Sequence, residues 1–144
     1  MKNTIIYLIG FAGTGKLTTA KEICKLADFQ LIDNHYINNP IFKLIHKDGK
    51  MPLSESVWIQ VRKIRDIVLE TVETICPADY NFIFTNVLTN EDLGDLEIYK
   101  KIEQTALSRN STFVPVHLTC ELAENMRRVG MPDRKLNMKE LSPE

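Results

Sequence analysis

The sequence lacks any apolar run of the length that a membrane-spanning helix requires. Its first apolar run follows Met1-Lys2 and ends at Ile9, which is too short for the core of a signal peptide. A glycine-rich stretch then occupies the place where a cleavage site would be needed. We therefore expect a cytoplasmic protein that does not bind membranes.

The sequence also lacks a large excess of charge of either sign and closely spaced pairs of cysteines. The net charge of −1 gives no overall attraction to nucleic acid or to an anionic membrane, so we expect no nucleic-acid partner. Any substrate phosphate must then be bound by a local cluster of Lys and Arg. Cys24, Cys76 and Cys120 are far apart and form no Cys-x-x-Cys pair, which favours buried free thiols over disulfides or metal ligands. The 144 residues are predicted to form one domain, 1–144.

The most informative stretch lies near the start of the chain. A β-branched run over 5–9 predicts a strand buried on both faces, and the segment 10–16, Gly-Phe-Ala-Gly-Thr-Gly-Lys, leads directly into a helical pattern. Glycines allow successive backbone N–H groups to converge, the helix N-terminus adds positive potential, and the lysine adds a full charge. This order predicts a phosphate cradle; the alternative is a glycine-rich turn with an exposed lysine. The predicted nucleotide-binding residues are Gly10, Gly13, Thr14, Gly15, Lys16, Leu17 and Thr18.

The residue after the lysine departs from the common phosphate-loop motif. That position usually holds Ser or Thr, whereas here Leu17 occupies it and Thr18 follows. The segment 10–18 resembles the Gly-x-x-Gly-x-Gly-Lys-x-Thr motif of the nucleoside-monophosphate-kinase group of P-loop proteins, whose wider relatives include shikimate kinase, gluconate kinase and chloramphenicol phosphotransferase. The resemblance implies ATP and Mg²⁺ as cofactors, a catalytic role for Lys16, and Thr18 as a candidate metal ligand.

The rest of the chain predicts an α/β fold in which strands alternate with helices. The expected strands are 5–9, 29–32, 80–84 and 112–119, and the expected helices are 16–27, 40–47, 54–76, 90–109 and 121–129. Such alternation implies a parallel sheet between helical layers, a three-layer α/β/α arrangement. The resemblance, which covers about 4–134, implies the P-loop strand order 2-3-1-4. The fifth strand that is usual in the group is missing from the polar tail 131–144.

Ligands of open parallel sheets bind beyond the carboxyl ends of the strands, where Asp33, Asn34, His35, Thr85 and Asn86 are expected. In shikimate kinase and chloramphenicol phosphotransferase an acidic residue after the second strand contacts the acceptor hydroxyl or the metal. Asp33 resembles it in position and is a candidate catalytic residue; the alternative is a capping or turn role. His35 could bind an acceptor, but a hydrogen-bonded structural role is favoured. Thr85 and Asn86 replace the usual strand-three Asp, which counts against vigorous ATPase activity.

Arginines form the remaining candidates. Arg127, Arg128 and Arg134 resemble the lid of the kinase group, so Arg127 is a candidate catalytic residue and Arg128 a nucleotide-binding one, within a lid-like region of about 121–134. The alternative is that they are surface cations at a helix C-terminus. Arg62 and Arg65 on the long helix could meet an anionic group of an acceptor, although a solvated face is favoured. Trp58 is interpreted as core or pocket wall.

These features predict an ATP-dependent phosphotransferase that acts on a small-molecule or nucleotide acceptor. The alternative is a P-loop module that binds nucleotide without turnover, and a nucleoside-triphosphate hydrolase is the third possibility. Variable loops build acceptor pockets, so the sequence does not name the acceptor. It gives no oligomeric state either.

Overall fold

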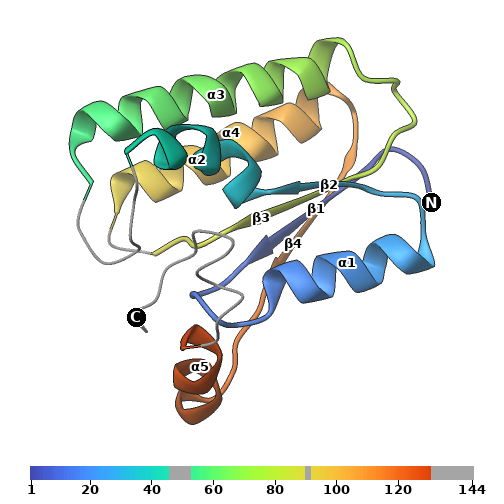
Figure 1. Ribbon diagram of the computed structural model, residues 1–144. Helices are drawn as coiled ribbons and strands as arrows, with labels where there is room; N and C mark the ends of the chain where they lie inside the picture. Colours follow the sequence, from blue (N-terminus) through green and yellow to red (C-terminus); the bar gives the residue numbers. More distant parts are fainter. Residues whose placement is uncertain (46–52, 90–91, 131–144) are drawn as a thin grey trace.

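The computed structural model describes residues 1–45, 53–89 and 92–130, in which strands and helices alternate along the chain (Figure 1). The strands are β1 (Thr4–Ile9), β2 (Gln30–Asp33), β3 (Phe82–Asn86) and β4 (Thr112–His117). The helices are α1 (Lys16–Leu26), α2 (Asn34–Phe42), the short 3₁₀ helix η1 (Lys43–Ile45), α3 (Glu55–Thr74), α4 (Leu93–Ser108) and α5 (Leu122–Val129). The polar tail 131–144, and with it the prediction that no fifth strand forms there, lies outside the described residues.

The four strands pair in parallel in the order β2-β3-β1-β4, which confirms the predicted order. β4 is an edge strand, and an edge position accommodates Pro115 because its missing N–H need not serve a neighbouring strand. The register places Ile9 beside Asn86 and Asp33 beside Thr85. The carboxyl ends of the adjacent strands β1, β3 and β2 therefore meet at one edge of the sheet.

Helices cover both faces of this sheet (Figure 1). α1 lies on one face, whereas α2, α3 and α4 lie on the other. On the α1 face, Leu8 and Ile83 pack with Ala20, and on the opposite face Tyr7 and Phe84 pack with residues of α3 and α4. Because β1 and β3 are covered on both sides, their sequences read as continuous apolar runs. The structure is thus the predicted three-layer α/β/α fold.

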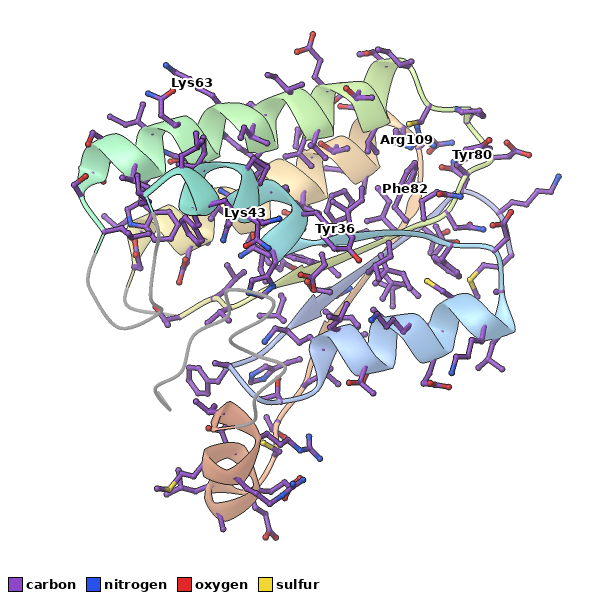
Figure 2. All side chains as sticks on the ribbon, viewed as in Figure 1. Tyr36, Lys43, Lys63, Tyr80, Phe82 and Arg109 are labelled. Atoms are coloured by element: carbon purple, nitrogen blue, oxygen red, sulfur yellow. The ribbon has the colours of Figure 1, made fainter. Side chains whose placement is uncertain are left out.

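The end of the sheet opposite the strand carboxyl termini is closed by Arg109. Its guanidinium lies 5.1 Å from the centroid of the Phe82 ring and donates to the carbonyl oxygens of Cys76 at 3.3 Å and Pro77 at 2.8 Å. Figure 2 shows Arg109 and Phe82 together there, beside Tyr80. These contacts tie the end of α3 to the end of α4. In the described part of the chain, no helix has both the length and the apolar character needed to cross a membrane.

The element starts that differ most from the sequence prediction are those of α2 and α4. α2 begins at Asn34 instead of residue 40, because the Asp33 carboxylate accepts the His35 backbone N–H at 3.0 Å and caps the helix there. Pro40 consequently lies inside the helix. α4 begins at Leu93 instead of residue 90, and the Leu93 side chain is 85% exposed. The apolar pattern of α4 becomes a buried face only further along, at Ile102 and Ala106.

Candidate functional site

A cleft of about 650 Å³ opens at the edge where the strand carboxyl ends meet. It is bordered by the loop between β1 and α1, by the ends of β2 and β3, and by side chains from α2, α3, α4 and α5. The residues that line it are Ala12, Gly13, Thr14, Gly15, Lys16, Leu17, Thr18, Thr19, Asp33, Asn34, His35, Asn38, Phe42, Trp58, Arg65, Thr85, Asn86, Val87, Asp95, Ile98, Arg127 and Arg128. The cleft therefore has the location at which ligands bind open parallel sheets.

The glycines of the β1–α1 loop are required by its geometry. Gly13 and Gly15 have φ values of 82° and 90°, in the left-handed region that side chains disfavour. Gly10 is excluded from carrying a side chain for another reason, since an added Cβ would lie 2.4 Å from the Leu118 carbonyl oxygen. Gly10 itself does not line the cleft but sets the turn at which β1 leaves the sheet. These constraints give the loop a fixed shape.

The loop presents unused hydrogen-bond donors. The backbone N–H groups of Gly13, Gly15, Leu17 and Thr18 have no acceptor among the described residues. They stand at the N-terminus of α1, where the helix dipole favours an anion. The Thr14 hydroxyl instead donates to the Phe11 carbonyl at 2.9 Å and stabilises the turn. A loop with several converging N–H groups fits phosphate oxygens.

Lys16 is folded onto this loop. Its Nζ donates to the carbonyl oxygens of Gly10 at 2.6 Å and Phe11 at 2.7 Å. The ammonium group therefore stands within the turn that surrounds the unused N–H donors. An anion held by those donors would lie beside a full positive charge.

Asp33 is buried at the end of β2 and holds three hydrogen bonds. Besides the His35 backbone N–H, its Oδ1 accepts from His35 Nδ1 at 2.7 Å, and its Oδ2 accepts from the Thr85 hydroxyl at 2.9 Å. Burial raises the pKa of the carboxyl, but the hydrogen bonds and charge of His35 and the Thr85 bond outweigh it and lower the pKa to about 2. Asp33 is therefore an ionised carboxylate fixed in orientation. His35 forms the hydrogen bonds predicted for it and also lines the cleft.

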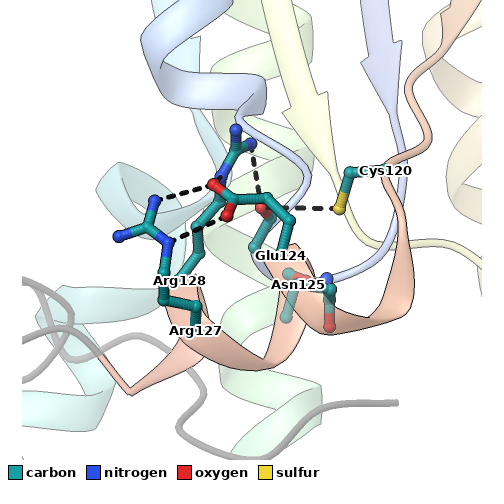
Figure 3. Close-up of polar contacts among 7 residues, drawn as sticks. Cys120, Glu124, Asn125, Arg127 and Arg128 are labelled. Carbon is teal, nitrogen blue, oxygen red and sulfur yellow. Dashed lines mark hydrogen bonds and ion pairs between the residues drawn. The ribbon is translucent and has the colours of Figure 1, made fainter.

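Arg127 and Arg128 reach the cleft from α5 and share one carboxylate partner (Figure 3). Glu124 accepts from Arg127 Nε at 2.8 Å and Nη2 at 2.7 Å, and from Arg128 Nε at 2.5 Å. Hydrogen bonds from Arg127 and then Arg128 lower the pKa of Glu124 to about 2. Because these groups are at least partly exposed, the pairs position the arginines more than they stabilise the fold.

α5 is fixed directly to the glycine loop. The buried Asn125 side chain donates to the Ala12 carbonyl, and Arg128 Nη1 lies 3.5 Å from the Gly13 carbonyl oxygen (Figure 3). The Val129 methyl group would be 3.1 Å from a Cβ placed on Gly13. A helix more than one hundred residues later in the chain thus forms one wall of the loop.

The structure brings most of the sequence-predicted residues to this one cleft. Those that line it are Gly13, Thr14, Gly15, Lys16, Leu17, Thr18, Asp33, Arg127 and Arg128. Arg134 lies outside the described residues. Trp58 is a cleft wall, as predicted, and packs edge-on against Phe42 with ring centroids 5.8 Å apart. The predicted solvated face is wrong for Arg65, which is 5% exposed and lines the cleft.

Sequence reasoning missed several cleft residues. Asn38 is on α2, whose start was placed too late, and Asp95 is in the first turn of α4. The position of Asp95 was inferable, because the helix that follows a strand carboxyl end begins near the ligand edge. Arg65 had a signal too. It lies four residues after Val61 and four before Leu69, both of which are buried.

Gly10→Ala tests the loop geometry. We expect it to lower the free energy of unfolding by about 1–3 kcal/mol, because the Cβ meets a backbone carbonyl that cannot rotate away. Gly130→Ala is the matched control, since the nearest atom to its Cβ is 3.7 Å away. Urea unfolding of the two variants measures the effect. Equal stability of both would show that the chain does not approach closely at Gly10.

No protein-family model matches the chain, and no curated protein does. Among solved structures, thymidylate kinase from Candida albicans is similar over 95% of this chain and 72% of its own, with 18% identity and a TM-score of 0.60. Shikimate kinase from Acinetobacter baumannii is similar over 92% of this chain and 64% of its own, with 16% identity and a TM-score of 0.54.

A chain of the Pnkp1/Rnl/Hen1 RNA repair complex is similar over 96% of this chain at 18% identity, with a TM-score of 0.60. The present chain spans only 39% of that one. Identities this low establish shared architecture and leave activity to be argued from the site. The strand order, the layers and these likenesses agree: the chain has the P-loop fold of the nucleoside-monophosphate-kinase-like group.

Proposed function

We propose that the protein is a phosphotransferase that moves the terminal phosphoryl group of ATP to a small-molecule or nucleotide acceptor in the cytoplasm. The observation that carries the proposal is the composition of the cleft at the carboxyl edge of the sheet. It combines a loop of unused N–H donors with the ionised carboxylate of Asp33, at the edge of a P-loop kinase fold. One half suits the triphosphate and the other suits a hydroxyl or phosphate that attacks it.

On the triphosphate side, the N–H groups of the loop and the ammonium of Lys16 would bind the outer phosphates. The guanidinium groups of Arg127 and Arg128 would also bind the phosphates once phosphate oxygens replace the Glu124 carboxylate. This exchange is feasible because a phosphate, like a carboxylate, offers two oxygens that accept from a guanidinium. We propose that α5 is the fixed part of a lid-like region over 121–134. Its attachment at Ala12 and Gly13 supports that role.

The residues present fit a magnesium ion bound together with ATP. The Thr18 side chain is exposed in the first turn of α1 and lines the cleft, so its hydroxyl is placed to bind a hard cation. Among the described residues no three acidic, His or Cys side chains cluster into a metal site, which suits an ion held mainly by phosphates. When bound, Mg²⁺ would neutralise charge on the phosphate oxygens.

Asp33 is proposed to orient the acceptor. A carboxyl with a pKa of about 2 is a weak base at neutral pH, so its main contribution is a fixed hydrogen-bond acceptor and a negative charge. Phosphoryl transfer through a loose transition state requires little deprotonation of the attacking group before bond formation. A weakly basic, firmly positioned carboxylate is therefore adequate for this reaction.

A nucleotide-binding module without turnover is the second candidate, and the neutral Asn86 favours it. Asn86 ends β3, where a carboxylate would help to hold the water shell of the metal, and an amide cannot balance that charge. Both candidates bind a nucleotide, but only the phosphotransferase would release ADP faster when an acceptor is added.

ADP release measured with a panel of acceptors separates the candidates. The panel should contain hydroxy acids, sugars, nucleoside monophosphates and a short RNA, the last because a similar chain comes from an RNA repair complex. The phosphotransferase predicts that one class raises ADP release well above the rate without acceptor. Tight ATP binding with no ADP release supports the module, and ADP release that no acceptor changes supports a hydrolase.

A further inference from the structure

His35 lies in the first turn of α2 and connects the buried Asp33 carboxylate to the cleft. Its Nδ1 is 2.7 Å from Asp33 Oδ1, and its backbone N–H donates to the same oxygen at 3.0 Å. The Asp33 side chain is 3% exposed, whereas the His35 side chain is 26% exposed and lines the cleft. The imidazole therefore has one edge on a fixed anion and the rest of its ring beside the space open to a ligand.

The carboxylate determines which ring nitrogen of His35 carries the proton. Asp33 is ionised, since its pKa is lowered to about 2, and an ionised carboxylate only accepts hydrogen bonds. Nδ1 must therefore be the donor in the contact with Asp33 Oδ1. In a neutral imidazole the other nitrogen, Nε2, is then a hydrogen-bond acceptor and a base. Among the described residues, Nε2 has no hydrogen-bond partner.

Asp33 itself is poorly suited to take a proton from a ligand. A carboxylate has about four lone-pair positions, and the His35 backbone, the His35 ring and the Thr85 hydroxyl use three of them. The position that remains can orient a bound group, but a carboxyl with a pKa of about 2 is a weak base at neutral pH. Imidazole is the side chain whose ordinary basicity suits proton transfer near neutral pH.

We propose that His35 is the general base of the cleft, and that its Nε2 takes the proton of an attacking hydroxyl while Asp33 holds the ring in the required tautomer. The inference rests on the proposed function, because it adds a further catalytic residue to that reaction. Two observations carry it: the contact of Nδ1 with an ionised carboxylate, and the position of the ring on the cleft wall.

The step balances without a further reactant. The hydroxyl oxygen forms a bond to the γ-phosphorus of ATP, and the bond from that phosphorus to the β,γ-bridging oxygen breaks, its electron pair leaving with ADP. The hydroxyl proton passes to His35 Nε2. The imidazolium that results is stabilised by the Asp33 carboxylate, and it returns its proton to water when the product leaves.

His35→Asn separates this role from a purely structural one. The asparagine amide N–H replaces the Nδ1 donor, so a role limited to the Asp33 hydrogen bond predicts nearly full activity. As the base, His35 predicts a fall in phosphoryl transfer of about 10²-fold, with ATP affinity almost unchanged. The rate is measured with the hydroxyl compound of the acceptor panel that gives the fastest ADP release.

Rescue of His35→Ala by small molecules tests the chemistry directly. Added imidazole should raise the transfer rate of this variant about 10-fold or more, in proportion to its concentration, because it restores a base in the vacated space. Pyrazole should not, since its ring has the same size but is a far weaker base. His117→Asn is the matched control, because His117 ends β4 and does not line the cleft. It should transfer phosphoryl at the wild-type rate and respond to neither compound.

Nuclear magnetic resonance of the ring nitrogens observes the tautomer without turnover. The chain has three histidines, and the signal that His35→Asn lacks belongs to His35. At about pH 8, above the range in which imidazole ordinarily changes charge, we expect the His35 proton on Nδ1 and none on Nε2. Thermal melting checks that each variant is folded. If His35→Ala is not, His35→Asn and the tautomer decide the question.

The inference is overturned if His35→Asn keeps the wild-type transfer rate, if pyrazole rescues His35→Ala as well as imidazole does, or if Nε2 carries the proton. Each of these results leaves the proposed function standing, because the wild type still transfers phosphoryl. Failure of the proposed function is seen in the wild type instead. If no acceptor raises its ADP release, both the phosphotransferase and the role of His35 in it are rejected.

Discussion

Lys16→Ala should leave a folded protein that has lost phosphoryl transfer by a factor on the order of 10² to 10³ or more. The ammonium stands inside the glycine loop, 2.6 Å from the Gly10 carbonyl oxygen, so it would adjoin the phosphate oxygens that gain charge in the transition state. Its removal takes away that charge but leaves the N–H donors of the loop in place. The rate with a good acceptor and the affinity for ATP measure the loss.

Stability provides the control for this variant. Lys16 gives up two hydrogen bonds to loop carbonyls, so the melting temperature without ligand should fall by only a few degrees. Lys21→Ala, at an exposed position of the same helix, should change neither activity nor stability. A collapse of the Lys16→Ala fold without ligand would indicate that the lysine holds the loop together structurally and would weaken the phosphate-cradle interpretation.

Asp33→Asn should slow phosphoryl transfer by a factor on the order of 10² or more while ATP affinity stays almost unchanged. Asparagine has the same shape and still accepts a hydrogen bond, but it carries no charge and cannot take a proton. Because the pKa of Asp33 is about 2, the wild-type pH–rate profile should show no inflection from this group between pH 5 and pH 8. Single-turnover rates and nucleotide titrations of the two proteins measure these effects.

The structure gives Asp33 a capping role as well, and the two roles predict different losses. As the cap of α2 alone, Asp33 would be replaced by asparagine with little consequence, since asparagine is an equally good N-cap. Loss of the charged hydrogen bonds to His35 and Thr85 adds a stability cost of about 1–3 kcal/mol. Full activity in a destabilised variant would leave Asp33 with the structural role only.

The sequence predicted those parts of the molecule that local chemistry determines. The β1–α1 loop needs glycine at Gly13 and Gly15 for its φ angles, so the motif and the conformation imply each other. The strand order followed from the alternation of elements together with the resemblance that the loop itself supports. The carboxyl edge of the sheet then placed Asp33 and Asn86 near the loop.

The parts that were not predicted depend on packing between distant elements. The Asn39-Pro40 pair is typical of a helix start, but the Asp33 cap begins α2 six residues earlier. Leu93 is a large apolar residue within a predicted helix, yet in the first turn of α4 it is exposed. Arg65 was predicted to be solvated because arginine is seldom buried. It is buried because it lies on the same face of α3 as Val61 and Leu69, which packs against the rest of the protein.

The attachment of α5 to the glycine loop has a consequence for synthesis of the protein on the ribosome. The complete loop motif has been translated once Thr18 is made, but Asn125 and Val129 close its far wall only after more than one hundred further residues. A nascent chain that has emerged as far as β4 carries every residue of the motif without its final enclosure. We therefore expect the growing chain to capture nucleotide only after α5 has emerged and closed this wall.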